Sequence, residues 1–323
     1  MRRALWLLAV SLSLASAPAR AAEPLSKKRS SGYYYLHSGL TVGGFALTGL
    51  EERLFGNHGP GPGWNRYSFY PDDVVQLNFS QSAAAMSDRT LALAVLAPTL
   101  VQMSSGFDIS MANATLVYAQ THMLSFFLTS TTKLIARRPR PYTHATDPRI
   151  QEFADSEGGD AYVSFFSGHS SAAFTAATAG SLLYSARTDE LVARHTLWGL
   201  EFVLAGMTAQ LRVRAGRHYR TDIWVGGAVG IGVGVLVPAL HQVELSRVRG
   251  SEIGVAAGAT ALTMVVSELV EICDLLDLIN ACNFERNVTV PVAPSSDRQA
   301  GLRYFVVPTA YPGGGGLQLS GDF

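Results

Sequence analysis

Residues Leu211–Leu240 read LRVRAGRHYRTDIWVGGAVGIGVGVLVPAL, a stretch in which a charged segment leads directly into an apolar one. The first half gathers four arginines, a histidine and an aspartate within eleven residues, although only 15% of the chain is charged. The second half, Ile223–Leu240, is apolar, rich in glycine and long enough for a helix. The pattern predicts a buried helix whose first turn lies beside a cluster of charge.

Four more apolar segments precede this helix, and loops rich in charge, glycine or proline separate them. They are Thr90–Met103, Met111–Leu134, Ser170–Ser185 and Thr196–Leu211. Each is long enough for a helix, so we expect an all-α helical bundle over residues 90–245. Residues 22–89 are expected to hold a short N-terminal helix and a loop rich in glycine and proline. Residues 246–323 are expected to form an extension that ends in a short C-terminal β-hairpin.

Residues 1–21 predict a secretory signal peptide, because two arginines precede a short apolar core and then small residues ending at Ala21. The alternative is a retained membrane anchor. We therefore expect a mature chain that begins near Ala22 and is exported to the periplasm or cell envelope.

The two cysteines, Cys273 and Cys282, lie nine positions apart. In one continuous helix their Cα atoms would be about 13 Å apart, whereas a disulfide spans no more than about 7 Å between Cα atoms. Either the chain turns between them and they pair, as an oxidising compartment would allow, or they are separate thiols.

Polar content distinguishes the apolar segments from one another. Only Ile223–Leu240 looks suited to lipid, because the other segments carry side chains that are costly in hydrocarbon, Glu201 among them. We therefore expect buried core helices with peripheral membrane contact, and an integral membrane bundle is the alternative. The net charge of zero gives no indication of a nucleic-acid partner.

Charge gathers in two further places. In Lys133–Tyr142, KLIARRPRPY, the prolines end the helix. In Ser164–Phe174, SFFSGHSSAAF, Ser167-Gly168-His169 opens the next helix, whose first amide groups have no partners within the helix. Each cluster alone is typical of an ordinary helix cap.

Together the three clusters supply cations, free amides, two histidines and a carboxylate, which suit the binding and transfer of a tetrahedral oxyanion. A carboxylate at Asp222 bonded to Nδ1 of His218 would leave Nε2 as a nucleophile. His169 would then protonate the departing alkoxide.

These residues resemble the three-part signature of the type 2 phosphatidic acid phosphatase superfamily, which includes bacterial acid phosphatases and vanadium haloperoxidases. The matching positions are Lys133 with Arg140-Pro141, then Ser167-Gly168-His169, then Arg212 with His218 and Asp222. Two neighbouring positions depart from the usual pattern: Phe166 stands where the family usually has proline, and Leu211 where it usually has serine.

The resemblance implies a metal-independent phosphomonoesterase with no cofactor, whose substrate is a phosphorylated lipid or small molecule. His218 would form a phosphohistidine, Asp222 would orient it, and His169 would act as acid and then as base. The phosphate would be bound by Lys133, Arg140, Ser167, Gly168 and Arg212, at one end of the core helices.

Three other readings remain open. The first is a vanadate-dependent haloperoxidase. The second is a metal-dependent hydrolase with His169, His218 and Asp222 as ligands. The third is a non-enzymatic envelope protein on the same scaffold. The sequence does not specify the oligomeric state, and the remaining arginines of the opening stretch, Arg214, Arg217 and Arg220, are expected to face solvent.

Overall fold

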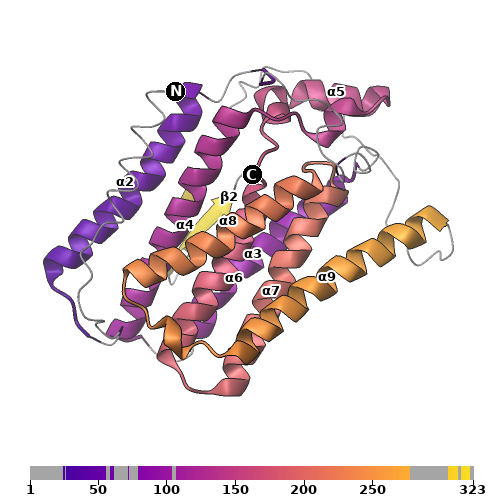
Figure 1. The fold of residues 1–323 in the computed structure, drawn as a ribbon. Coiled ribbons are helices and arrows are strands. Elements are labelled where there is room, and N and C mark those ends of the chain that lie inside the picture. The colour runs from indigo at the N-terminus through magenta and orange to yellow at the C-terminus, as the bar shows by residue number, and fades with distance from the viewer. Residues whose placement is uncertain are drawn as a thin grey trace.

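The computed structural model describes residues 25, 27–55, 59–61, 72, 79–103, 107–276, 305–311 and 314–320. Long helices make up most of this part of the chain (Figure 1): α2 (Ser31–Phe55), α3 (Gln81–Met103), α4 (Ile109–Ala136), α6 (Gly168–Arg187), α7 (Leu191–Arg214), α8 (Arg220–Leu240) and α9 (Gly250–Leu276). The shorter helices are α5 (Pro148–Ser156), η2 (Pro141–His144), η3 (Gly158–Tyr162) and η4 (Leu245–Arg247). The expected all-α bundle is confirmed, since each predicted apolar segment lies in one of the long helices.

Two features of the helices were not expected. Helix α2 spans 25 residues, although the sequence predicted a short helix there. Helix α9 has 27 residues and was not predicted at all. Cys273 lies within α9, whereas Cys282 and the expected signal peptide lie outside the described residues.

The C-terminal extension contains strands β1 (Phe305–Tyr311) and β2 (Gly314–Ser320). They pair antiparallel, with Phe305 opposite Ser320 and Tyr311 opposite Gly314. Residues 312 and 313, between the strands, lie outside the described part of the chain, so the expected hairpin and its packing against the bundle stay predictions.

Helix α6 lies at the centre of the bundle, and every residue from Gly168 to Ser185 is buried. It packs against α8, whose glycines Gly226, Gly230 and Gly234 recur every fourth residue and face it. A Cβ atom added to Gly226 would lie 2.5 Å from the carbonyl oxygen of Ser167. The two helices therefore approach closely, and the start of α6 lies against the first turns of α8.

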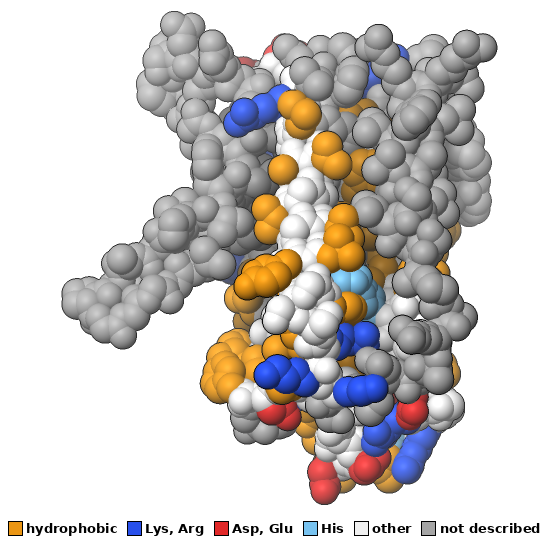
Figure 2. All heavy atoms as spheres, turned by 90° about the vertical axis from the view of Figure 1, so that its left-hand side faces the viewer, with side chains coloured by type: hydrophobic (Ala, Val, Ile, Leu, Met, Phe, Trp, Pro, Cys, Tyr) orange, Lys and Arg blue, Asp and Glu red, His pale blue; other side chains and the backbone are white. Residues whose placement is uncertain are grey.

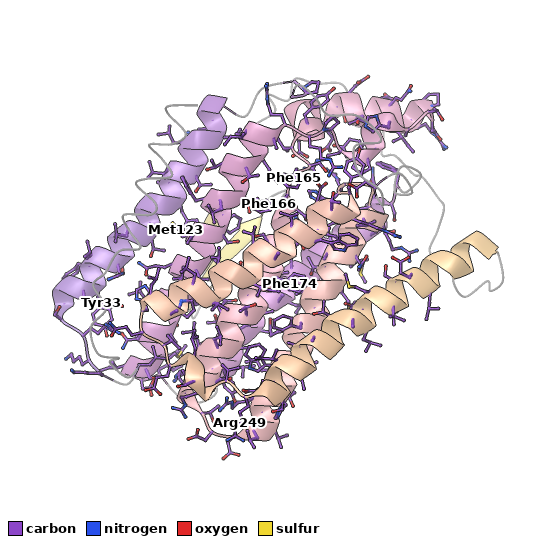
Figure 3. The ribbon with its side chains drawn as sticks, in the orientation of Figure 1. Tyr33, Met123, Phe165, Phe166, Phe174 and Arg249 are labelled. Atoms are coloured by element: carbon purple, nitrogen blue, oxygen red, sulfur yellow. The ribbon has the colours of Figure 1, made fainter. Side chains whose placement is uncertain are left out.

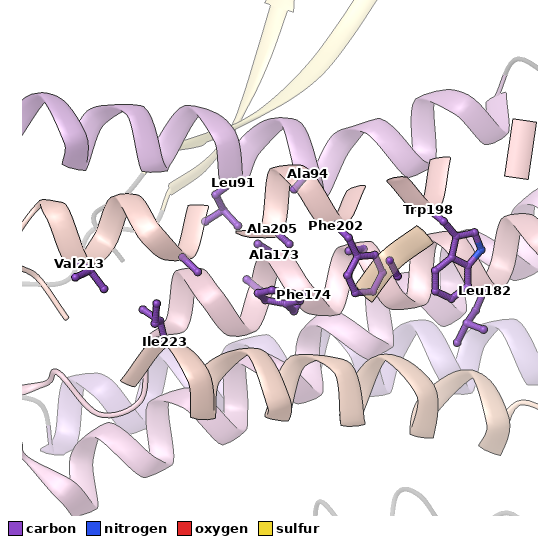
Figure 4. Close-up of a cluster of buried hydrophobic side chains, with 14 residues drawn as sticks. Leu91, Ala94, Ala173, Phe174, Leu182, Trp198, Phe202, Ala205, Val213 and Ile223 are labelled. Carbon is purple, nitrogen blue, oxygen red and sulfur yellow. The ribbon is translucent and has the colours of Figure 1, made fainter. Parts of the chain in front are cut away.

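A hydrophobic core lies between α3, α6 and α7 (Figure 4). The rings of Trp198 and Phe202 stack with their centroids 5.7 Å apart, and Phe174 of α6 packs edge-on against Phe202 at 5.9 Å. Leu91 and Ala94 contribute to the same core from α3. This packing fixes α3 and α7 against the central helix.

The outer surface of the bundle is strongly apolar. Leu93, Leu96 and Leu100 of α3 are each more than half exposed, and so is Val42 of α2. Figure 2 shows hydrophobic side chains along the length of the face at the left of Figure 1, with charged side chains gathered towards one end.

Three helices of the described part are long and apolar enough to cross a membrane: Gln81–Met103, Arg220–Leu240 and Gly250–Leu269. The expectation that only Ile223–Leu240 suits lipid is therefore wrong. The reason is that the first of these helices starts at Gln81 instead of the predicted Thr90 and is therefore longer than expected, while the third was not predicted.

Candidate active site

The three charged clusters meet at one end of the bundle. Helices α4 and α7 end there, α6 and α8 begin there, and α5 lies beside them (Figure 1). Figure 3 shows Phe165 and Phe166 at this end, with Tyr33 and Arg249 towards the other. The positive dipole ends of two helices are therefore directed to the same place.

Main-chain hydrogen bonds join the three clusters pairwise. The donors and acceptors are Ser164 N to Arg138 O (3.0 Å), Ser167 N to Asp222 O (3.1 Å) and Tyr142 N to Gly216 O (3.3 Å). Segments up to 74 positions apart in the chain are thus fixed to one another without the use of side chains.

His218 lies just before α8 and is fully buried. Its Nδ1 lies 2.7 Å from the carbonyl oxygen of Ser164, so Nδ1–H donates to that oxygen. Its Nε2 is buried and has no hydrogen-bond partner. Burial, followed by the positive charge of nearby arginine and lysine side chains, lowers the pKa of His218 well below its ordinary value. The ring is therefore neutral, with one nitrogen anchored and the other available to react.

Asp222 does not make the direct bond to His218 that the sequence predicted, since its Oδ2 lies 3.7 Å from Nδ1. Its oxygens instead accept from Arg138 Nη1 (2.6 Å), Ser164 Oγ (2.5 Å) and Tyr219 N (2.9 Å). Three donors hold the carboxylate at the start of α8, away from the ring. Asp222 thus positions Ser164, and the Ser164 carbonyl in turn orients His218.

Arg138 and Ser164 were missed as site residues because they carry no role in the signature. Arg138 is 4% exposed, and it also binds Asp72 at 2.8 Å and lies 4.0 Å above the centroid of the Tyr219 ring. The run of arginines in KLIARRPRPY was the available signal for Arg138, but the sequence does not show which arginine turns inward.

His169 is the second residue of α6 and is 1% exposed. Its Nε2 lies 2.7 Å from Oδ1 of Asp88, a residue of α3 that the sequence did not indicate. Burial and then the charge of Arg212 lower the pKa of His169 to about 3, while Asp88 acts in the opposite direction. The second histidine ring is therefore also neutral.

Arg140 is fully buried and binds the carboxylate of Asp160 at 2.8 Å and its carbonyl oxygen at 2.7 Å. Burial opposes ionisation of Asp160, but the charges of Arg140 and Arg217 outweigh it, and the pKa of Asp160 is lowered. Asp160 thus neutralises part of the cation cluster.

The other two predicted cations also reach this place. Arg212 is 3% exposed, and its Nη1 lies 3.1 Å from Ser87 Oγ. A Cβ atom added to Gly168 would lie 3.7 Å from Nζ of Lys133, so the ammonium group approaches the first turn of α6. Ser167 caps that turn by accepting from Ser170 N at 3.3 Å, which leaves its hydroxyl hydrogen able to donate.

Arg217 does not face solvent, contrary to expectation. Its side chain is 14% exposed and binds Glu157 at 2.8 Å. Its guanidinium carbon lies 5.2 Å from the centroid of Phe153, and Tyr142 packs edge-on against Phe153 at 5.3 Å. Arg220 likewise pairs with Glu268 of α9 at 3.1 Å. Arg217 therefore adds positive charge at an aromatic rim of the site.

Residues 114–245 match the family model of the PAP2 superfamily, in agreement with the resemblance found in the sequence. No curated protein and no solved structure matches the chain. The matched region contains Lys133, His169 and His218, whereas Asp88 precedes it. This match to residues 114–245 supports a phosphatase-type activity at a coarse level.

Proposed function

We propose that the chain is a metal-independent phosphomonoesterase that hydrolyses lipid or small soluble phosphate esters through a phosphohistidine at His218. The observation that carries this proposal is the protonation and hydrogen bonding of the His218 ring. The ring is neutral, its Nδ1 is anchored, and its Nε2 is buried without a partner beside three cationic side chains. A nucleophile needs a bare nitrogen and a nearby site that binds the group under attack.

The phosphate oxygens would be held by Lys133, Arg140, Arg212, the Ser167 hydroxyl and the Gly168 amide. An incoming phosphate brings about two negative charges, which compensate the repulsion among these cations. Ionised donors give the shorter and stronger hydrogen bonds, so binding should be tight and selective for a tetrahedral oxyanion. No cofactor is needed for this binding.

The reaction then takes two steps. In the first, Nε2 of His218 attacks phosphorus, the bond to the ester oxygen breaks, and His169 gives a proton to the departing alkoxide, which leaves as an alcohol. In the second, water attacks the phosphohistidine, His169 accepts a proton from it, and the phosphorus–nitrogen bond breaks to release inorganic phosphate. The net reaction consumes one water for each ester.

Burial and the charge of Arg212 lower the pKa of His169 to about 3. A bound phosphate places negative charge within a few ångströms of the ring, and such a charge favours the protonated imidazole. Protonation of His169 is therefore coupled to substrate binding, which supplies the acid only when an ester is present.

The apolar outer surface supports a lipid phosphate over a soluble one. Three helices are apolar enough to cross a membrane, and the site lies at one end of them, near the depth at which a lipid headgroup would sit. We propose an integral membrane location with the site at the surface of the bilayer, on the exported side. Alkaline carbonate extraction with N-terminal sequencing tests this: release from membranes, with a mature chain starting near Ala22, would favour the soluble exported alternative.

The function is tested with purified protein and a panel of lipid and soluble phosphomonoesters. Phosphate release that persists in a chelator is expected, together with rapid ³²P labelling that is labile in acid and stable in base. The label should be absent from His218→Ala. Loss of activity in the chelator would favour the metal-dependent reading, in which His169, His218 and Asp222 are ligands. Among the described residues, no group of three or more metal-binding side chains is arranged for an ion.

Two other outcomes favour the remaining readings. Oxidation of bromide with peroxide and vanadate, without phosphate release, would indicate the haloperoxidase. Turnover of no ester in the panel and no bromide oxidation would indicate the non-enzymatic envelope protein.

A further inference from the structure

We propose that Asp88 is a positioning residue for His169, holding Nε2 of the imidazole so that Nδ1 faces the leaving oxygen; this rests on the phosphatase function proposed above. Asp88 lies outside the region matched by the family model and outside the three charged clusters.

The geometry supports this role. Asp88 Oδ1 lies 2.7 Å from Nε2 of His169, within hydrogen-bonding distance, and 3.6 Å from Nη1 of Arg212. The Asp88 side chain is 47% exposed, whereas that of His169 is 1% exposed. A partly exposed carboxylate thus contacts a buried ring. An imidazole has two ring nitrogens, so a carboxylate on Nε2 leaves Nδ1 for proton transfer.

The two histidines are then anchored in complementary ways. His218 is held through Nδ1 by the Ser164 carbonyl, which leaves Nε2 for phosphorus. His169 is held through Nε2 by Asp88, which leaves Nδ1 for the ester oxygen. Fixing one nitrogen of an imidazole decides its tautomer and orientation, and here each ring is fixed for a different task.

Charge gives Asp88 a second effect on His169. The charged and titratable groups around the ring are Asp88 of α3, Lys133 of α4, Arg212 of α7 and His218 before α8. Asp88 is the carboxylate among these groups. Its charge raises the pKa of His169 and so favours the imidazolium form, whereas burial and Arg212 lower that pKa. Asp88 stays ionised through the cycle, while Nδ1 gives its proton to the leaving oxygen and later takes one from water.

Asp88 also faces the bound phosphate through Arg212. Its negative charge repels an oxyanion and partly neutralises the guanidinium that would hold it. Removing the charge should therefore weaken proton transfer and strengthen phosphate binding at the same time. A purely structural residue would not separate these two quantities.

The kinetic test compares Asp88→Asn, Asp88→Glu and His169→Ala on an alkyl phosphate and on 4-nitrophenyl phosphate, from pH 5 to 9. For Asp88→Asn we expect kcat on the alkyl ester to fall by about tenfold to a hundredfold, with a much smaller fall on the aryl ester. KM should not rise, and the basic limb of kcat should move about one pH unit lower. Asp88→Glu should restore part of the loss. The control, Asp155→Asn on the exposed face of α5, should behave as wild type.

The double variant Asp88→Asn, His169→Ala should be no slower than His169→Ala alone, because Asp88 acts through that ring. Additive losses would overturn the proposal, and so would an unchanged alkyl-to-aryl ratio and pH profile in Asp88→Asn.

A second experiment does not depend on catalytic turnover. In protein labelled with ¹⁵N-histidine and assigned with His169→Gln, the His169 resonances report the tautomer and its titration. Asp88→Asn should lower the pKa of His169 and remove the preference for hydrogen on Nε2; an unchanged spectrum would overturn the proposal. If wild type hydrolyses no ester, the phosphatase function fails, and this experiment still decides whether Asp88 controls the ring.

Discussion

The two ends of the bundle hold similar groups in different surroundings. One end contains His169 and His218, and the other contains His37 and His241, whose ring centroids are 5.0 Å apart. Burial lowers the pKa of His241 to about 4, so a low histidine pKa occurs at both ends. At the far end, however, the neutral hydroxyl of Tyr33 occupies Nδ1 of His241 at 2.9 Å.

The partner of His37 is likewise neutral, since Gln120 Nε2 lies 3.0 Å from its Nδ1. At the site end, three cations surround the rings and Nε2 of His218 has no partner. The comparison teaches that neither burial nor a lowered pKa distinguishes the two ends. The proposed nucleophile differs from the far-end histidines in having an available nitrogen beside converging positive charge.

The largest expected effect comes from replacing His218, which lies just before α8, with alanine. The matched control replaces His241, which lies just after α8. His218→Ala should lower kcat by about 10⁴-fold or more, because the nucleophile is lost. His241→Ala at the far end should change kcat by less than about twofold, because it touches no reacting group. Steady-state phosphate release measures both, and equal losses would remove the distinction between the ends.

Each end also has a buried arginine–carboxylate pair, which sharpens the comparison. Arg138 binds Asp222 at 2.6 Å, and Arg194 binds Glu252 at 2.6 Å and 2.8 Å. Breaking either pair with alanine strands a buried charge and should cost about 3–5 kcal/mol of unfolding free energy.

Activity per folded molecule separates the two variants. It should fall in Arg138→Ala, because Asp222 loses its fixed position, and should be retained in Arg194→Ala. Unfolding curves combined with active-site titration measure both quantities. A folded, fully active Arg138→Ala would contradict the role given to Asp222.

The next effect concerns the acid. His169→Ala should slow hydrolysis of an alkyl phosphate by about a hundredfold or more, and that of 4-nitrophenyl phosphate far less, because an aryl oxide leaves without a proton. His37→Ala is the matched control and should leave the ratio of the two rates unchanged. A similar loss on both esters would show that His169 has another role.

The smallest effect tests the packing of α8 on α6. Gly226→Ala would bring a methyl group 2.5 Å from the Ser167 carbonyl oxygen, whereas nothing lies within 4 Å of a Cβ at Gly232. Gly226→Ala should cost about 1–3 kcal/mol and reduce activity by moving Ser167. Gly232→Ala should gain a few tenths to about 1 kcal/mol from helix propensity. Thermal unfolding measures the stability of both variants. Equal stabilities would mean that α6 and α8 are not in tight contact.

Much of the fold was predictable because it depends on local signals. Apolar length predicted the core helices, and Pro139 and Pro141 marked the end of α4. Helix α9 was not predicted, although it has the same apolar character and begins with Gly250. The burial of Glu201 agrees with the expected core helices, although the sequence did not show which face of α7 is covered.

The candidate site was likewise predictable only in part from the sequence. The spacing within each cluster identified Lys133, His169 and His218 as members of one site. Asp88 could not be found, because 81 positions separate it from His169 and no short pattern contains both. Ser164 acts through its carbonyl oxygen, a group that every residue has, so its sequence position carries no signal.

The main-chain hydrogen bonds that join the three clusters have a consequence for mutational tolerance. Because they use only amide hydrogens and carbonyl oxygens, any residue with an amide hydrogen can stand at positions 164 and 167 without loss of the frame. Proline is the exception, since it has no such hydrogen. The two departures from the family pattern, Phe166 and Leu211, fall at positions that supply neither donor nor acceptor to this frame. The side chains at positions 166 and 211 can therefore change, and with them the fit of the substrate, without disturbing the main-chain hydrogen bonds that align the three clusters.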